Sequence, residues 1–476
     1  MNYETVIGLE IHAELSTNSK TYCGCPAKFT DEVNIHICPG CLAMPGTLPV
    51  LNRKVVDYGI KAGLATNCRI APICKQDRKN YFYPDLPKAY QNSQLDQPLC
   101  IGGWLDITVD GEVRRIGLTR IHIEEDAGKL LHYASGGSLV DLNRGSVPLI
   151  EIVTEPDMRS AEEARIFLEN LKSILEYTEV CDCKMQEGSL RCDVNVSVRP
   201  VGQKEYGTRV EMKNINSFRA AFRAIEYEAQ RQIDVIEDGG TLRQETRRWD
   251  DDNGKTYAMR NKEQAQDYRY FPDPDLAPIV VSDEWIEEIR KTLPELPQAK
   301  IVRYMSSFGL PEYDSEKIAA SKAMALFFED AVNLGSSPKT TANWLLGDIS
   351  KMLNEQGKEP QDIPFEPSHL AKLISLIDGG TLSNSAGKKV IDELFENPRD
   401  PEVIVKEKGL VQISDEGALT KIVADVIAAN PQSVADYKAG KDKAMGFLVG
   451  QAMKVSKGQG NPQILNKLIK DMLDSI

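Results

Sequence analysis

The chain has 476 residues, is 41% hydrophobic and 27% charged, and carries a formal net charge of −14. This length is enough for two to four domains of ordinary globular composition. No apolar run is long enough to span a membrane and the first residues lack the features of a signal peptide, so we expect a cytoplasmic protein. The acidic balance argues against a protein that coats DNA but leaves room for RNA binding through a local basic face.

Polar and apolar residues alternate along residues 6–14, which predicts a half-buried β-strand. Glu10, His12 and Glu14 would share its polar side. His12 taken alone would be interpreted as an ordinary satisfied polar residue, so a role as a metal ligand depends on its neighbours.

Four of the ten cysteines cluster after this strand, as Cys23, Cys25, Cys38 and Cys41. A long chain without an export signal is not expected to be built on disulfides. A CxC pair followed by a CxxC pair, with a Pro-Gly turn inside the second, predicts a structural zinc site in a loop. The alternative is four free thiols near a turn.

Cations and aromatic residues interleave along residues 77–91, where Lys79 and Lys88 lie among several tyrosines. This composition suits phosphate contacts and base stacking, but an ordered loop with extended lysines explains it equally well. Residues 267–273 form a similar segment.

Three further stretches, residues 120–128, 191–199 and 209–214, repeat the alternation with carboxylates on the polar side. An antiparallel sheet with one buried face would gather these polar sides on one wall. Carboxylates gathered on one sheet face, even with Arg, Lys and Asn between them, repel one another unless a positive charge compensates them. A hard cation that also binds a phosphate would compensate this negative charge.

Within this wall, Glu124 would share a face with His122, and Glu125 would lie on the opposite side unless the strand bends. Glu151 is a charge inside the apolar run 148–153 and is costly to bury unless it is paired or bound to a metal. Ordinary salt bridges are the alternative. The repetition over four strands favours a magnesium-like site.

Helical patterns appear at residues 160–175 and 217–236, and strand patterns vanish beyond a turn-rich segment near residue 293. The remaining chain predicts helices near residues 314–334, 338–355, 366–378, 384–396, 415–429, 432–438, 442–457 and 463–474. We therefore expect an α+β protein, with a strand-rich domain at 1–292, a helical domain at 293–405 and a small helical tail at 406–476.

The tail is locally basic, because seven lysines against two aspartates lie between residues 436 and 470. The lysines that suit an RNA backbone best are Lys441, Lys443, Lys454 and Lys457. A solvated charged surface is an equally good explanation of this run. The chain has no GxxxxGK[ST] loop and no GxSxG elbow, so neither a P-loop enzyme nor a serine hydrolase of that kind is indicated.

Six ordered motifs resemble those of a known family: residues 8–15, 77–85, 122–129, 188–195, 211–214 and 267–272. The chain closely resembles the GatB subunits of the tRNA-dependent aspartyl/glutamyl amidotransferases, the GatCAB complexes. The resemblance runs the full length and includes residues 443–450 of the tail.

This resemblance implies a cradle domain on a mainly antiparallel sheet, an all-α middle domain and a YqeY-like helical tail. It implies an enzyme that phosphorylates the side-chain carboxylate of misacylated Glu-tRNA(Gln) or Asp-tRNA(Asn) with ATP. Ammonia from a GatA-type amidase then displaces the phosphate, and a third, GatC-type subunit links the other two.

By the same resemblance, His12, Glu124 and Glu151 match the magnesium site. Glu10, Glu125, Asp193 and Glu211 match the acidic catalytic pocket, and Lys79 and Arg191 are candidates for phosphate contacts. The four cysteines place the chain among the zinc-bearing members of the family. Two other functions stay open: a zinc-stabilised tRNA-docking scaffold without catalysis, and a metal-dependent RNA phosphoesterase.

Overall fold

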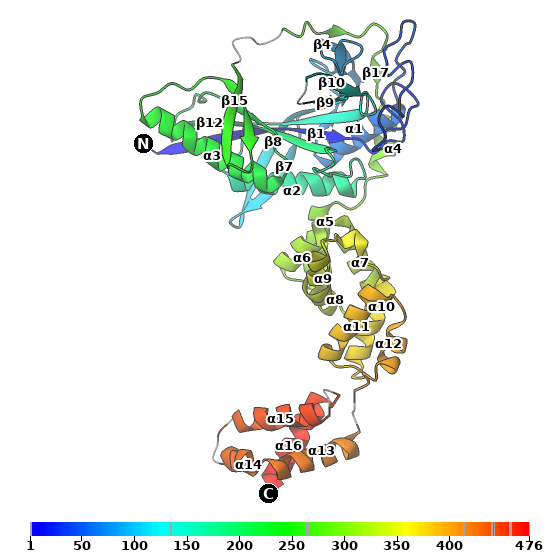
Figure 1. Cartoon of the computed structure of the whole chain (residues 1–476), viewed down its shortest axis with the longest axis vertical. Helices are drawn as coiled ribbons and strands as arrows, with labels where there is room; N and C mark the ends of the chain where they lie inside the picture. Colours follow the sequence, from blue (N-terminus) through cyan, green and yellow to red (C-terminus); the bar gives the residue numbers. More distant parts are fainter. Residues whose placement is uncertain are drawn as a thin grey trace. The chain divides into compact units, whose positions relative to one another are not determined.

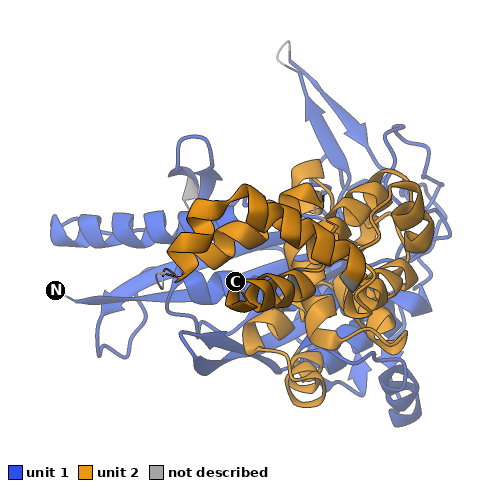
Figure 2. Cartoon of the chain, turned by 90° about the horizontal axis from the view of Figure 1, so that it is seen from below, with its two compact units in different colours: residues 1–297 blue, residues 298–476 orange. Residues whose placement is uncertain are grey.

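The computed structural model describes residues 2–133, 136–261, 267–412, 415–438, 441, 443–456 and 459–475. The chain divides into two compact units, Met1–Pro297 and Gln298–Ile476, coloured separately in Figure 2. No helix in these described ranges is long and apolar enough to cross a membrane.

The first unit is built on one large sheet with the strand order β15-β14-β13-β12-β1-β11-β8-β6-β2, with β7 paired to β8 (Figure 1). All neighbouring strands run antiparallel except β13 and β14. The strands are β1 (Tyr3–Glu14), β2 (Arg69–Ile70), β6 (Cys100–Ile101), β7 (Trp104–Val109), β8 (Glu112–Glu125), β11 (Pro148–Thr154), β12 (Leu190–Pro200), β13 (Val210–Lys213), β14 (Glu245–Asp250) and β15 (Lys255–Asn261).

The alternation in the sequence determines which face of the sheet is buried. Ile7, Leu9, Ile11 and Ala13 of β1 are all buried in the main hydrophobic core. This core also holds apolar residues of α2 (Ala161–Tyr177) and α3 (Phe218–Glu237), which pack against each other and against the sheet. The opposite face of β1 therefore carries Glu10 and His12, as the alternation predicts.

The helix α1 (Arg53–Ala65) was not expected from the sequence, which suggested only two helices in this region. Gly59 and Gly63 lower helix propensity and obscure the pattern. The structure explains them, because a Cβ atom at Gly59 would lie 2.5 Å from Leu99 and one at Gly63 would lie 2.5 Å from Cys100. The two glycines let α1 pack closely on the core.

Three small sheets complete the first unit: β16-β4-β5, β10-β9 and β17-β3. Their strands are β3 (Ile73–Cys74), β4 (Asp77–Asn80), β5 (Tyr90–Ser93), β9 (Lys129–His132), β10 (Ser138–Asp141), β16 (Phe271–Pro272) and β17 (Ile279–Val280). Pairing of β4 with β16 joins the two aromatic segments that the sequence singled out. The short helix α4 (Asp283–Arg290) follows.

Every regular element described in the second unit is helical (Figure 1). These elements are α5 (Pro297–Phe308), α6 (Glu312–Ala319), α7 (Lys322–Asn333), α8 (Pro338–Trp344), η2 (Leu345–Ile349), α9 (Ser350–Gln356), η3 (Pro360–Asp362), α10 (Pro367–Asp378), α11 (Asn384–Glu396), α12 (Pro401–Glu407), α13 (Glu416–Ala429), α14 (Pro431–Lys438), α15 (Lys443–Val455) and α16 (Pro462–Ser475). The α+β class with a mainly antiparallel sheet is confirmed.

The single helix expected at residues 314–334 is in fact two, because Ser321 accepts a hydrogen bond from Met324 N and begins α7. Residues of α13, α15 and α16 share a separate small core. The division of the helical region at residue 405 stays a prediction, and this residue lies inside α12.

Candidate active site

Strand pairing gathers the acidic residues of the polar face around Glu151. On β1, His12 is opposite Glu151 of β11, and Glu151 is opposite His122 of β8. Glu124, two residues further along β8, points to the same side. Four polar side chains from three strands therefore meet on one face of the sheet.

Short contacts join these four residues. His122 Nε2 lies 3.1 Å from Glu124 Oε1 and 3.4 Å from Glu151 Oε2. His12 Nε2 lies 3.5 Å from Glu151 Oε2 and 4.0 Å from Glu124 Oε2. Glu124 and His122 are buried.

The electrostatics of the cluster favours charged carboxylates. Burial alone would raise the pKa of Glu151, but hydrogen bonds with His12 and His122 outweigh it and hold that pKa below its ordinary value. Burial likewise opposes ionisation of Glu124, yet His122 keeps the pKa of Glu124 low. Burial disfavours the charged form of His122, but its hydrogen bonds with Glu124 and Glu151 raise its pKa to about 9.

Strand β5 supports the cluster from one side. Ser93 Oγ donates a hydrogen bond to Glu124 Oε1 at 2.5 Å, and Gln91 Nε2 donates to Glu124 Oε2 at 3.3 Å. Burial has the largest effect on the pKa of Glu124 and raises it, His122 lowers it and Glu151 raises it. The charge of Lys79 on β4 also lowers this pKa, by a smaller amount. Its ammonium lies 5.1 Å from the ring centre of Tyr268. The predicted phosphate contact Lys79 is thus beside the carboxylates.

The donor set fits a hard divalent cation. One ligand atom each from His12, Glu124 and Glu151 lie within 4.8 Å of one another. Two carboxylate oxygens and one imidazole nitrogen suit Mg²⁺ or Mn²⁺, which complete their coordination with waters and phosphate oxygens.

The remaining predicted catalytic carboxylates occupy a neighbouring row. Asp193 is opposite Glu10, and both Asp193 and Glu211 are paired with Lys213, at 2.5 and 3.1 Å. Glu10 accepts a hydrogen bond from Asn195 at 3.0 Å. Burial, followed by the charge of Glu151, raises the pKa of Glu10. Glu10 is therefore the carboxylate of this row best suited to take up a proton.

Arg191 is opposite His12 in register, but its guanidinium is bound to Asp126, with Nη2 2.7 Å from Oδ2. The structure brings Arg191 to the edge of the cluster rather than into it. The charge of Arg191 slightly lowers the pKa of His12, and its effect is smaller than those of burial, Glu151 and Glu124.

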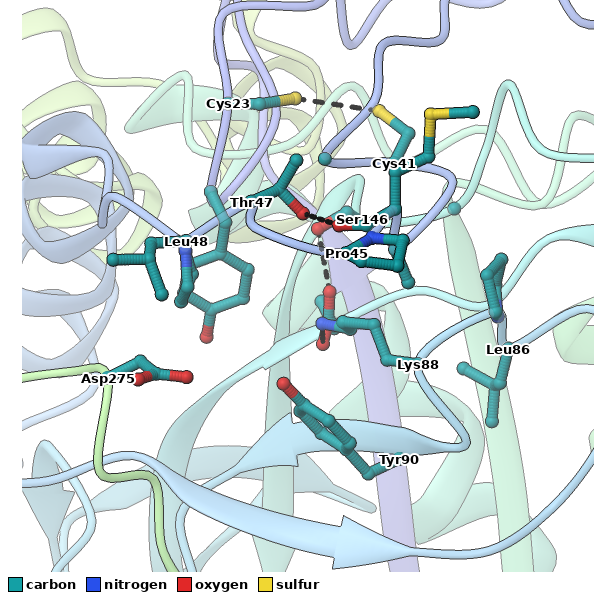
Figure 3. Close-up of a pocket in the computed structure, with 18 of the residues that line it drawn as sticks. Cys23, Cys41, Pro45, Thr47, Leu48, Leu86, Lys88, Tyr90, Ser146 and Asp275 are labelled. Carbon is teal, nitrogen blue, oxygen red and sulfur yellow. Dashed lines mark hydrogen bonds and ion pairs between the residues drawn. The ribbon is translucent and has the colours of Figure 1, made fainter.

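Glu125 does not join the metal cluster. It is held by an ion pair with Lys88 and by hydrogen bonds from Asn92 N at 2.9 Å and Ser146 Oγ at 2.6 Å. It lines a separate cavity of about 340 Å³ that also contacts the cysteine loop. Figure 3 shows Cys23 and Cys41 on one side of this cavity and Lys88 on the other.

The four cysteines form a compact cluster. Cys41 Sγ lies 3.6 Å from Cys23 Sγ, 3.7 Å from Cys38 Sγ and 3.8 Å from Cys25 Sγ. A tetrahedron with Zn–S bonds of about 2.3 Å has edges of about 3.8 Å, so the spacing is compatible with zinc.

Lys20 adds independent support for an anionic cluster. Its side chain is fully buried, and its ammonium lies 3.6 Å from Cys41 Sγ and 3.1 Å from the carbonyl oxygen of Leu142. A buried ammonium requires a negative partner, and a tetrathiolate site provides one.

The predicted RNA-binding lysines are exposed where the structure describes them. Lys443 and Lys454 lie about three turns apart on one side of α15, and Lys441 is paired with Asp436 at 2.9 Å. Lys457 lies outside the described residues.

Sequence reasoning did not include His122, Ser93 and Gln91 among the candidate site residues, although all three contact the carboxylates of the cluster. The signal for His122 was present, because it alternates with Glu124 on the same strand. Ser93 and Gln91 carry no such signal, since only the tertiary contact of β5 with β8 brings them to Glu124.

Comparisons with known proteins agree with this organisation. Residues 5–287 match the family model of the GatB/GatE catalytic domain, and residues 326–473 match that of the GatB domain. The chain is 62% identical over 480 residues to the GatB subunit of the aspartyl/glutamyl-tRNA(Asn/Gln) amidotransferase of Caldicellulosiruptor bescii, covering 100% of both chains. It is 61% identical to the protein of the same name from Thermoanaerobacter sp., covering 99% of this chain and 100% of that one. For the protein of the same name from Carboxydothermus hydrogenoformans, the identity is 56% and 99% of each chain is covered.

Proposed function

Because the chain belongs to the GatB family of tRNA-dependent aspartyl/glutamyl amidotransferase subunits, we propose that its acidic sheet face is where the amino-acid side chain is activated and amidated. The chain is one component of a multi-subunit ligase that forms C–N bonds in protein biosynthesis. The observation that carries the proposal is the convergence of His12, Glu124 and Glu151 on one point of that face.

The proposed reaction has two steps. An oxygen of the side-chain carboxylate of Glu-tRNA(Gln) or Asp-tRNA(Asn) attacks the γ-phosphorus of ATP, and the bond to the β-phosphate oxygen breaks, releasing ADP. Ammonia then attacks the acyl carbon, the C–N bond forms, and phosphate leaves as the C–O bond breaks. The products are Gln-tRNA(Gln) or Asn-tRNA(Asn).

The first step brings two anions together, so it requires positive charge at the site to reduce their repulsion. His12, Glu124 and Glu151 would hold Mg²⁺, which when bound neutralises the phosphates and aligns them with the carboxylate. Lys79, beside Glu124, adds a cation from β4. His122 holds both carboxylates in position through its hydrogen bonds.

The second step needs a base for the proton that the attacking ammonia loses. Glu10 fits this part, because burial raises its pKa while Lys213 binds its neighbours Asp193 and Glu211. Asp193 and Glu211 would instead hold the ammonium group of Lys213 in position.

The other subunits and the tRNA complete the proposal. A GatA-type amidase would supply ammonia, and a GatC-type subunit would link it to this chain. The cavity that contains Glu125 and Lys88 lies beside the cysteine loop and would be the path for ammonia, with water kept from the activated acyl group. The exposed Lys443 and Lys454 of α15 would contact the tRNA backbone. A cytoplasmic location goes with this function.

The test is Glu124→Gln in the reconstituted three-subunit complex with misacylated tRNA, ATP and glutamine. We expect amidation to be abolished while the complex still binds the tRNA. Glu112→Gln on the same strand, where Glu112 is exposed, is the matched control and should keep full activity. Full amidation by the Glu124 variant would instead favour a tRNA-docking scaffold. Cleavage of RNA without any amide donor would favour a phosphoesterase.

A further inference from the structure

Arg120 of β8 is a cation on the polar face of the large sheet that the proposed reaction has not used. The strand register fixes its position, because Glu151 of β11 is opposite His122 and Val153 of β11 is opposite Arg120. His122 and Arg120 are two residues apart on one strand, so both side chains point to the same side of the sheet and their Cα atoms are roughly 7 Å apart. Arg120 therefore lies directly beside the carboxylate cluster.

A β-bulge in β8 gives Arg120 this orientation. Leu118 before the bulge and Ile121 after it are both buried in the main hydrophobic core. An unbroken alternation from Leu118 would turn Arg120 toward the core as well. Instead, two consecutive residues of β11 are paired with Leu118 and Arg120, so that Thr119 is inserted as one extra residue. Bulges beside active sites commonly redirect side chains in this way.

Arg120 has no counter-ion on the sheet. Its Nε atom is buried without a hydrogen-bond partner, and no ion pair joins its guanidinium to any residue in the part of the chain that the structure describes. Its neighbours on the adjoining strands are Ile101 and Val153, whose side chains accept no hydrogen bond. A buried donor without a partner is costly. Because Arg120 is only partly buried, an anionic ligand can reach it.

Tyrosines lie between Arg120 and the cluster. The ring centres of Tyr268 and Tyr270 are 6.2 Å apart. Burial is the largest cause of the raised pKa of Tyr270, and the charges of Glu124 and Glu151 raise it further. The charge of Arg120 lowers the same pKa. The hydroxyl group of Tyr270 is therefore within electrostatic reach of both the carboxylates and Arg120.

The surroundings of Arg120 favour an amino-acid side chain over a phosphate group. Ile101, Val153 and the ring of Tyr270 offer apolar surface, which methylene groups can contact and a triphosphate cannot use. The phosphates of ATP already have Mg²⁺ and Lys79 as proposed partners. A guanidinium group binds a carboxylate through two parallel hydrogen bonds.

We propose that Arg120 binds the side-chain carboxylate of the misacylated amino acid and thereby selects the acidic substrate over its amide product. The proposal rests on the proposed function, which supplies an acidic side chain and converts it into a neutral amide. The carboxylate accepts two charge-assisted hydrogen bonds from the guanidinium, whereas the amide offers one uncharged oxygen. Arg120 would hold the attacking oxygen near the cluster and release the product once the charge is gone.

The test measures equilibrium binding to the reconstituted three-subunit complex without ATP or ammonia. The two ligands are tRNA(Gln) carrying glutamate and the same tRNA carrying glutamine, each attached to a 3′-amino group so that the amino acid is not lost by hydrolysis. The ligands differ only in carboxylate against amide, so contacts with the tRNA body cancel. The test variant is Arg120→Gln. The matched control is Arg115→Gln, because Arg115 is exposed on the same strand and is paired with Asp106.

We expect the wild type and Arg115→Gln to bind the glutamyl form more tightly than the glutaminyl form by about tenfold or more. Arg120→Gln should bind the two forms equally. Arg120→Lys keeps the charge without the planar fork and should retain only part of the preference. Binding of β,γ-imido-ATP with Mg²⁺ should be unchanged in both Arg120 variants.

A full preference in Arg120→Gln, or no preference in the wild type, would overturn the proposal. Weaker binding of β,γ-imido-ATP in Arg120→Gln with an intact preference would also overturn it and assign Arg120 to the phosphates. If Arg120→Gln does not assemble, Arg120→Lys decides, because a full preference in that variant contradicts the bidentate contact. Nothing is amidated in this experiment, so its result is independent of the amidation test of Glu124→Gln.

Discussion

At the scale of single residues, His122 is not an expected metal ligand, but it contacts two residues that are. It is buried, and it contacts both Glu124 and Glu151 through one nitrogen. Partners that orient metal ligands in this way commonly change metal affinity or activity by roughly 10–100-fold when they are removed.

We therefore predict that His122→Asn raises the Mg²⁺ concentration needed for half-maximal amidation by roughly 10–100-fold. A magnesium titration of the reconstituted complex measures this shift. His132→Asn is the control, because His132 is exposed and contacts only Ser138 among the hydrogen bonds described. An unchanged magnesium requirement in the His122 variant would show that the carboxylates keep their positions without it.

Lys20 is the second residue whose burial makes a clear prediction. Replacing it with Gln removes the ammonium beside Cys41 and leaves the negative charge of the thiolates without compensation. We expect Lys20→Gln to lose zinc about tenfold faster to a chromogenic chelator. Lys28→Gln, at an exposed position of the same loop, should retain zinc as the wild type does. Equal rates for the two variants would contradict the proposed electrostatic role.

At the scale of elements, the alternating strands were predictable and their pairing was not. The alternation in residues 6–14 places Glu10 and His12 on one face of β1, which the structure confirms. The position of β11 between β1 and β8, which puts Glu151 between two histidines, depends on long-range pairing that no local pattern encodes. The helix α1 was missed because the glycines that allow its packing lower its propensity.

The contact between α5 and α7 offers a prediction about stability. Glu329 of α7 accepts hydrogen bonds from Lys300 Nζ at 2.5 Å and Tyr304 Oη at 2.8 Å, and it also pairs with Arg303. Burial opposes its ionisation, but these donors lower the pKa of Glu329 below its ordinary value. The charged carboxylate therefore stabilises the folded state.

Glu329→Gln should lower the free energy of unfolding by about 2 kcal/mol at pH 7. Because the folded-state pKa is lowered, this contribution is present above the unfolded carboxyl pKa of about 4.3 and disappears as the pH falls through the folded value. Denaturant unfolding at pH 7 and pH 3.5 measures the difference. Glu355→Gln removes only an exposed pair with Lys351 and should change little at either pH, and a Glu329 variant that behaved likewise would refute the prediction.

At the scale of the whole molecule, the chain separates an acidic, strand-rich unit from a helical unit with a basic end. The composition of the sequence shifts near residue 293, and the two compact units of the structure divide after Pro297. The proposed division of labour assigns chemistry to the first unit and tRNA contacts to α15 of the second.

This division predicts that Lys443→Glu combined with Lys454→Glu weakens tRNA binding without changing the magnesium requirement of amidation. If each lysine neutralises one phosphate, the slope of log affinity against log salt should become shallower by nearly two. Binding measured over a series of salt concentrations gives this slope. Lys351→Glu on α9, which is also exposed, should leave it unchanged. An unaltered slope in the double variant would assign the tRNA contacts to other residues.

The cluster around Glu151 is proposed to perform phosphate transfer to the amino-acid side chain, and the other assignments depend on this one. The most direct measurement uses the reconstituted complex with Glu-tRNA(Gln), ATP labelled at the γ-phosphate, Mg²⁺ and no source of ammonia. We predict that label passes to the glutamyl group in the wild type and not in Glu151→Gln. Equal labelling in both proteins would refute the assignment and place the phosphorylation site elsewhere.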